Sequence, residues 1–175
     1  MRDTSEKYRE FYNIIYDMDI HPMVQEMKNY RQHYDCSCYD HCLSVAYYCF
    51  CICKKLHLDE KSMARAAFVH DLLLYDWRVR QPNRKGLHAF THAKTAYTKA
   101  SHIFKLNDKE RDIILKHMWP VTLVPPKYLE SYILTLVDKY STIEESYAYY
   151  KKKICCRKFF QTASSLLLLL FIYLP

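Results

Sequence analysis

The sequence is nearly free of glycine, and this scarcity limits the folds it can form. Gly86 is the single glycine among 175 residues, and the six prolines are scattered along the chain. Many-stranded folds need glycine in their tight turns, whereas glycine and proline destabilise helix interiors. The composition therefore predicts an all-α protein, and the length fits one domain with a sizeable core.

A secretory signal peptide is also lacking, because the first ten residues, MRDTSEKYRE, are charged and polar. We therefore expect a cytoplasmic protein whose eight cysteines stay reduced. The cysteines of YYCFCICKKL are interpreted as small apolar helix residues. Cys36, Cys38 and Cys42 could instead bind zinc, although they lack the second paired cluster that structural zinc sites show.

The charge is unbalanced, with 26 Lys and Arg against 19 Asp and Glu, a formal net charge of +7. This excess suits an anionic small molecule, a nucleic acid or an acidic membrane surface. The basic residues are dispersed, and aromatic residues are not interleaved with them in a repeating way. We therefore expect no nucleic acid polymer as a partner.

Apolar residues recur at helical spacing through most of the chain and predict six or seven helices with no strand. Residues 1–30 are interpreted as a helical extension, residues 31–150 as the main domain and residues 151–175 as a basic, then apolar, tail. Asp59 is expected to cap a helix over about 59–75, and Asn107 or Asp108 is expected to cap a short helix that ends near Met118. Further helices are expected over about 39–56, 88–106 and 126–149.

The tail ends in nine apolar residues, Leu166 to Leu174, about half of the ~20 residues that a membrane-spanning helix needs. Two interpretations remain. The favoured one is a terminal helix that docks on the core or frays. The other is a weak peripheral contact with an anionic membrane, made by the basic residues and the apolar end.

The strongest local signal is the pair His70-Asp71 inside the apolar run RAAFVHDLLLY. A buried carboxylate is costly unless it is paired or bound to a cation. An ion pair with Arg65 and a metal site are equally compatible with this dipeptide. His41 and His117 lie on the apolar faces of their helices, and His88 and His92 share one helical face, which favours the metal site.

Asp138 lies on a mixed face in YILTLVDKYS, so its helical position alone favours a solvated carboxylate. The order of the residues is more informative. His41 in YDHCLSVA, His70-Asp71 in AAFVHDLLL and Asp138 in TLVDK resemble the H…HD…D signature of the HD-domain superfamily of metal-dependent phosphohydrolases. The resemblance covers about residues 31–145 and implies an orthogonal helical bundle of the HD type.

Binuclear members of that superfamily insert two further histidines between HD and the last aspartate. His92 and His117 stand where these would fall, with His88 as the alternative to His92. The resemblance then implies two divalent ions, with Asp71 bridging them and with His70 and Asp71 central to catalysis. Mn, Fe, Co or Zn suit such ligands better than Mg. The MWPVTLVPP segment lacks the G-Y-P element of members that cleave cyclic dinucleotides, which disfavours that substrate.

Candidate substrate-binding groups surround these ligands. Arg78, Arg80 and Arg84, here called the loop arginines, follow the HD dipeptide closely and could bind phosphate oxygens, as could Lys94 after His92. Equally, these basic residues could form a solvated surface. His33, with Trp77 and Trp119, could line a pocket that stacks a base. Tyr34 stands beside His33 where the family would have a small residue.

The sequence thus predicts hydrolysis of a phosphate ester in a small phosphorylated metabolite, with a nucleotide as the favoured substrate, by a hydroxide held on the metal ions. One alternative is a non-catalytic module that keeps the metal and senses a phosphorylated ligand. A third interpretation is an adaptor tethered to a membrane surface by residues 151–175.

Overall fold

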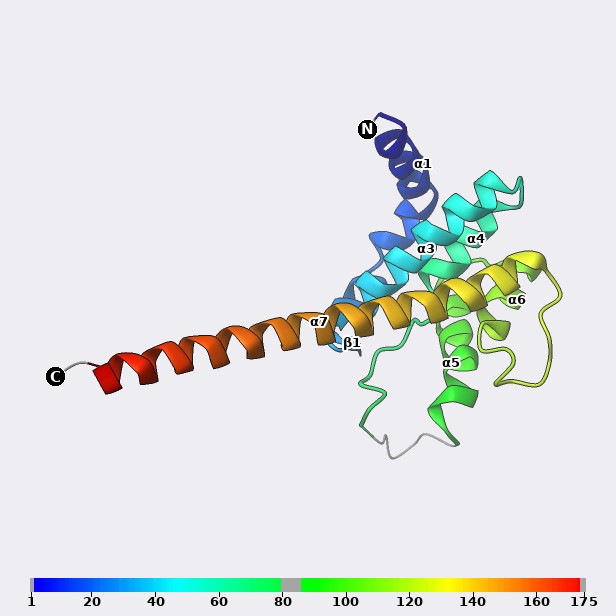
Figure 1. The fold of residues 1–175 in the computed structure, drawn as a ribbon. Helices are drawn as coiled ribbons and strands as arrows, with labels where there is room; N and C mark the ends of the chain where they lie inside the picture. The colour runs from blue at the N-terminus through cyan, green and yellow to red at the C-terminus, as the bar shows by residue number, and fades with distance from the viewer. Residues whose placement is uncertain (1, 80–85, 174–175) are drawn as a thin grey trace.

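The computed structural model describes residues 2–79 and 86–173, with side chains described for residues 5–79 and 86–154. The described chain is all-α apart from one small hairpin (Figure 1). Its helices are α1 (Arg2–Asp19), α2 (Pro22–Glu26), α3 (Cys38–Lys55), α4 (Glu60–Phe68), α5 (His88–Ile103), α6 (Asp108–Lys116) and α7 (Leu129–Tyr173). A 3₁₀ turn, η1 (Met27–Asn29), precedes the antiparallel strands β1 (Arg31–His33) and β2 (Cys36–Ser37).

The helix starts follow the expected capping chemistry. The Asp59 carboxylate accepts the Ser62 amide at 3.0 Å and begins α4. Asn107 begins α6 in a capping box with Glu110, in which each side chain accepts the other residue's backbone amide. Both predicted caps are confirmed. At α3 the cap is Ser37, which accepts the Asp40 amide at 3.1 Å.

The core forms where α3 packs against α4 on one side and α7 on the other, and α6 contacts both α4 and α7. Fully buried side chains from five helices belong to this core: Phe11, Phe50, Phe68, Ile113 and Leu134. The N-terminal helix α1 belongs to this core, since it contacts α3 and α4. Buried residues of α1, among them Phe11, therefore lie in one cluster with buried residues of the later helices.

The helix expected over 59–75 is shorter than predicted, because α4 ends at Phe68. The Ala67 carbonyl, which would accept the Asp71 amide in a continuing helix, lies 2.7 Å from His70 Nδ1 instead. The chain therefore turns, and both His70 and Asp71 point into the interior (0% and 4% exposed). The expectation of no strand is also wrong, since residues 31–37 form the hairpin.

The last helix is much longer than predicted. No glycine or proline occurs between Pro126 and Pro175, so nothing in the sequence ends α7 before Tyr173. In Figure 1 the orange and red part of α7 extends away from the other helices. The expectation that the tail docks on the core is therefore wrong. Among the helices described, none is both long enough and apolar enough to cross a membrane.

Candidate metal centre

Five elements bring the six predicted ligands together in the interior of the bundle. His41 comes from α3, His70 and Asp71 from the turn after α4, and His92 from α5; His117 follows α6, and Asp138 lies on α7. Their ligand atoms fall into overlapping groups that could each hold a metal ion, namely His41–His70–Asp71, His70–His117–Asp138 and Asp71–His92–His117. The four histidines are at most 5% exposed.

Asp71 lies between two sets of imidazole nitrogens. Its Oδ1 is 3.5 Å from His92 Nε2 and 3.7 Å from His117 Nε2. Its Oδ2 is 3.8 Å from His70 Nε2 and accepts a hydrogen bond from the Gln32 side chain. Asp71 Oδ1 and His70 Nε2 are buried and have no hydrogen-bond partner. Such orphaned atoms are costly in a protein interior, and a bound cation would satisfy both.

The backbone fixes which nitrogen of three imidazoles faces the centre. The Nδ1 atoms of His70, His92 and His117 lie 2.7 to 2.9 Å from the carbonyls of Ala67, His88 and Ile114. A carbonyl can only accept, so each Nδ1 carries the proton and each Nε2 presents a lone pair. His92 Nε2 and His117 Nε2 are nevertheless only 2.8 Å apart. Two facing lone pairs repel each other, and a metal ion that both nitrogens bind would remove that repulsion.

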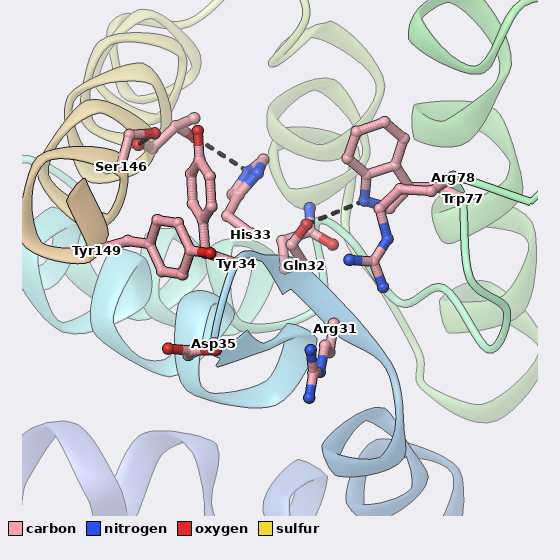
Figure 2. A pocket seen from close by; sticks show the side chains of 10 residues that line it. Arg31, Gln32, His33, Tyr34, Asp35, Trp77, Arg78, Ser146 and Tyr149 are labelled. Carbon is pink, nitrogen blue, oxygen red and sulfur yellow. Dashed lines mark hydrogen bonds between the residues drawn. The ribbon is translucent and has the colours of Figure 1, made fainter. Parts of the chain in front are cut away.

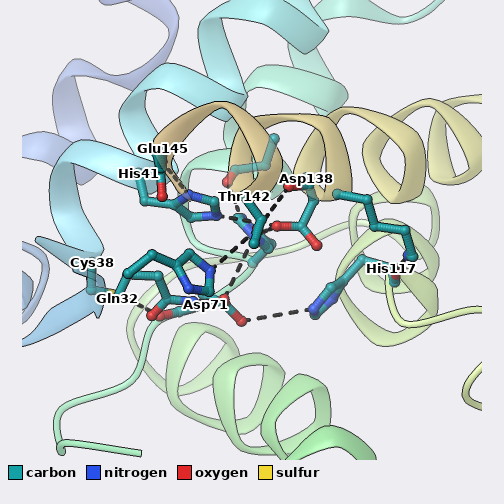
Figure 3. A network of polar contacts seen from close by, with 12 residues as sticks. Gln32, Cys38, His41, Asp71, His117, Asp138, Thr142 and Glu145 are labelled. Carbon is teal, nitrogen blue, oxygen red and sulfur yellow. Dashed lines mark hydrogen bonds and ion pairs between the residues drawn. The ribbon is translucent and has the colours of Figure 1, made fainter. Parts of the chain in front are cut away.

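His41 and Asp138 complete the centre on the side of α7 (Figure 3). His41 Nε2 lies 3.1 Å from Asp138 Oδ1, and Asp138 Oδ1 lies 3.6 Å from His70 Nε2. The second nitrogen of His41, Nδ1, lies 2.8 Å from the Glu145 carboxylate. A metal-binding histidine typically donates its other N–H to a carboxylate or carbonyl, and His41 has such a partner.

The electrostatics differ between the two sides of the centre. On the side of α7, burial would lower the pKa of His41, but the carboxylates of Asp138 and Glu145 outweigh it and raise the pKa to about 10. The Asp71 side is different. Burial alone would raise the pKa of Asp71, but the charges of His70 and His92 outweigh it and lower the pKa to about 2. Burial lowers the pKa of His117 to about 4, which keeps the imidazole neutral at physiological pH. An ionised carboxylate beside neutral imidazole is the protonation state that metal ligands need.

Neither of the two competing interpretations, an ion pair of Asp71 with Arg65 and a zinc site of cysteines, is found among the described residues. Arg65 pairs with Glu110 at 2.9 Å and with Asp17 at 3.1 Å, and not with Asp71. Among residues 5–79 and 86–154, none of the groups that could hold a metal contains a cysteine. The Cys38 thiol instead donates to the Asp71 backbone carbonyl at 2.9 Å.

The family model of the HD domain, which describes the sequences of that family, matches residues 38–143, well over half of the chain. The chain belongs to the HD domain family. The family is all-α and consists in general of metal-dependent phosphohydrolases, which agrees with the helical bundle and the ligand cluster. Neither a curated protein nor a solved structure matches the chain.

A cavity of about 470 Å³ opens beside the HD ligands. Its lining includes Asp71, His92 and Asp138 together with apolar and aromatic side chains, among them Trp77, Met118 and Ile143. The rings of Trp77 and His88 stack there at 5.3 Å with only 13° between their planes. A second cavity, of about 480 Å³, lies between the hairpin, Trp77 and α7 (Figure 2), and His33 lines both.

The predicted substrate-binding residues of the HD domain lie in different places, and only some of them line a cavity. His33 lines the first cavity, where its Nε2 lies 3.2 Å from Thr142 Oγ1. Arg78 is exposed, lines the second cavity and pairs with Asp76 at 2.8 Å. Lys94 is exposed and is not among the described residues that line either cavity. Arg80 and Arg84 lie outside the described residues.

The remaining sequence-based candidates are settled by packing. Trp77 lines the first cavity, as expected, whereas Trp119 packs against Tyr132 at 5.5 Å. His92 Nε2 lies 3.5 Å from Asp71 Oδ1, whereas the ring of His88 stacks on Trp77.

Three functional candidates of the HD centre were not predicted: Gln32, Lys139 and Glu145. Glu145 lies two helical turns after Asp138, so the periodicity of one helix could have revealed it. Lys139 follows Asp138 directly, and its Nζ lies 3.2 to 3.4 Å from the carbonyls of Thr135, Trp119 and His117. No local pattern could have revealed Gln32, which lies 39 residues before Asp71.

Proposed function

We propose that this HD domain binds two divalent ions and hydrolyses a phosphate ester in a small phosphorylated metabolite, with nucleotides as the preferred class. The observation that carries the proposal is the position of the buried Asp71 carboxylate. One of its oxygens faces His92 and His117, and the other faces His70. His41, His70 and Asp138 would hold one ion, His92 and His117 the other, and Asp71 would contribute to both.

The donor set suits Mn, Fe, Co or Zn, since imidazole nitrogens outnumber carboxylates. Bound ions of this kind supply Lewis acidity at a phosphate oxygen and lower the pKa of a water molecule toward neutrality. The protein need not provide a nucleophile of its own. Thr142 carries the one hydroxyl among the described residues that line the first cavity, and this hydroxyl already donates to the Asp138 carbonyl at 3.0 Å.

The nucleotide preference rests on the lining of the first cavity. Trp77 and His88 present stacked flat rings, a surface on which a base can stack. The lining of the same cavity also includes a positive charge, because Lys139 is a half-buried cation that follows the candidate ligand Asp138. A molecule with a flat apolar part and an anionic part therefore complements the cavity better than a sugar phosphate does.

The test is elemental analysis of the purified protein followed by a phosphate-release screen. The panel contains nucleoside monophosphates, sugar phosphates and an aryl phosphate, each assayed with Mn, Co, Zn or Mg. We expect about two ions per chain and the fastest release from a nucleotide, with none from the Asp71→Asn variant. A protein that binds metal but releases phosphate from no member of the panel would contradict the proposed hydrolysis.

A further inference from the structure

Helix α7 carries an exposed apolar stripe that begins on the part packed in the helical body and continues outward along the helix. The side chains of the stripe are 50% to 69% exposed, and they are Leu136, Tyr140, Ile143, Tyr147, Tyr150 and Ile154. Successive members are separated by four and three residues in alternation. This 3.5-residue period is typical of a helix that pairs with another helix in a coiled coil.

We propose that this stripe, here called the α7 seam, pairs in antiparallel fashion with the same seam of a second copy of the chain. A coiled coil requires a partner helix with the same period, and the chain itself supplies one. The helix is also accessible, since in Figure 1 its C-terminal part extends clear of the other elements. A helix of 45 residues is long enough to pair while its first turns stay packed in the body.

The charges along α7 favour a second copy in the antiparallel direction. Glu144 borders the seam near the body, and residues 151–153, all lysine, border it further out. In the register that places Tyr147 beside Tyr150 of the second copy, Glu144 lies level with the lysine segment of that copy. A parallel pair would instead bring the two lysine segments together, and like charges at such positions destabilise a coiled coil.

The register that pairs Tyr147 with Tyr150 also fixes the size of the interface. It brings Ile143, Tyr147, Tyr150 and Ile154 against the same four residues of the second copy, and with about 150–200 Å² for each complete side chain these four expose roughly 400 Å² per copy. Their pairing would bury about 800 Å² over both copies, the size of a weak and reversible interface. The seam also borders the first cavity, because Ile143 belongs to both. The second copy would therefore lie beside the entrance to the metal centre.

The experiment measures the molar mass of the full-length chain by sedimentation and light scattering over a series of concentrations from about 1 μM to a few hundred micromolar. We expect the mass to rise with concentration toward twice the mass of one chain. Tyr147→Glu and Ile154→Glu each place a charge in the seam and should give monomers with unchanged circular dichroism. Tyr16→Glu is the matched control, because Tyr16 is equally exposed (53%) but lies on α1, and this variant should remain a dimer.

A charge exchange tests the direction of pairing. Glu144→Lys should weaken the dimer at least several-fold, and Lys151→Glu added to it should restore the wild-type association. Failure of the double variant to restore the dimer would overturn the antiparallel arrangement. A wild-type chain that is monomeric would overturn the proposal itself. A monomer that binds vesicles of anionic lipid through the same residues would identify the α7 seam as a lipid-binding surface instead.

Discussion

Glu145 offers the sharpest test of how the fold prepares the metal ligands. Its carboxylate lies 2.8 Å from His41 Nδ1, on the side of the ring that faces away from Asp138. The contact is shielded, since the His41 side chain is fully buried and that of Glu145 is only 18% exposed. The carboxylate holds the proton on Nδ1 and makes Nε2 more basic, which strengthens the bond from Nε2 to a cation.

Two substitutions separate these effects. Glu145→Gln keeps an oxygen that accepts the Nδ1 proton but removes the charge, whereas Glu145→Ala removes both. Loss of such an outer partner costs 10- to 100-fold in metal affinity, or about 1.4 to 2.7 kcal/mol. We expect the glutamine variant near the lower end of this range and the alanine variant near the upper end, with the helical content of both unchanged.

Competition with a chelating dye, titrated with Co or Zn, measures the affinities. Glu144→Gln is the matched control, because Glu144 is the adjacent residue on the same helix and is exposed. It should bind metal as the wild type does. If both Glu145 variants bind metal as tightly as the Glu144 control, the carboxylate does not support His41, and the assignment of His41 as a ligand loses its structural basis.

Three further outcomes are expected. Asp71→Asn should lose at least one of two ions, whereas His117→Ala should retain one, as metal analysis will show; a wild type with a single ion would reduce the centre to a mononuclear one. Neutralising the loop arginines together should raise KM for a nucleotide several-fold without changing metal content. Unaltered kinetics would show that these arginines are solvated surface residues that do not bind the substrate. Deleting residues 159–175 should leave the melting temperature unchanged, because α7 extends away from the core there. If the tail contacts membranes, the same deletion should abolish binding to anionic vesicles.

Much of the fold could be predicted from the sequence because the deciding interactions are local. One glycine in the whole chain excludes a turn-rich sheet, and Asp59 and Asn107 begin helices through contacts within three residues. The order of His41, His70-Asp71 and Asp138 likewise identified the family without reference to distances. Periodicity alone had placed Asp138 on a mixed face, and the family signature corrected that.

The tertiary structure decided where these residues point and what supports them. The sequence pattern of RAAFVHDLLLY favours a continuous helix. In the structure the helix ends at Phe68, and the Ala67 carbonyl contacts the His70 side chain instead of a backbone amide of a further helical turn. Gln32 reaches Asp71 only because the hairpin folds across the bundle. Such contacts join residues far apart in the chain, and a pattern with a period of three to four residues carries no information about them. The sequence by itself therefore determined the helical class and the family, whereas packing decided where the helices end and how the candidate ligands face one another.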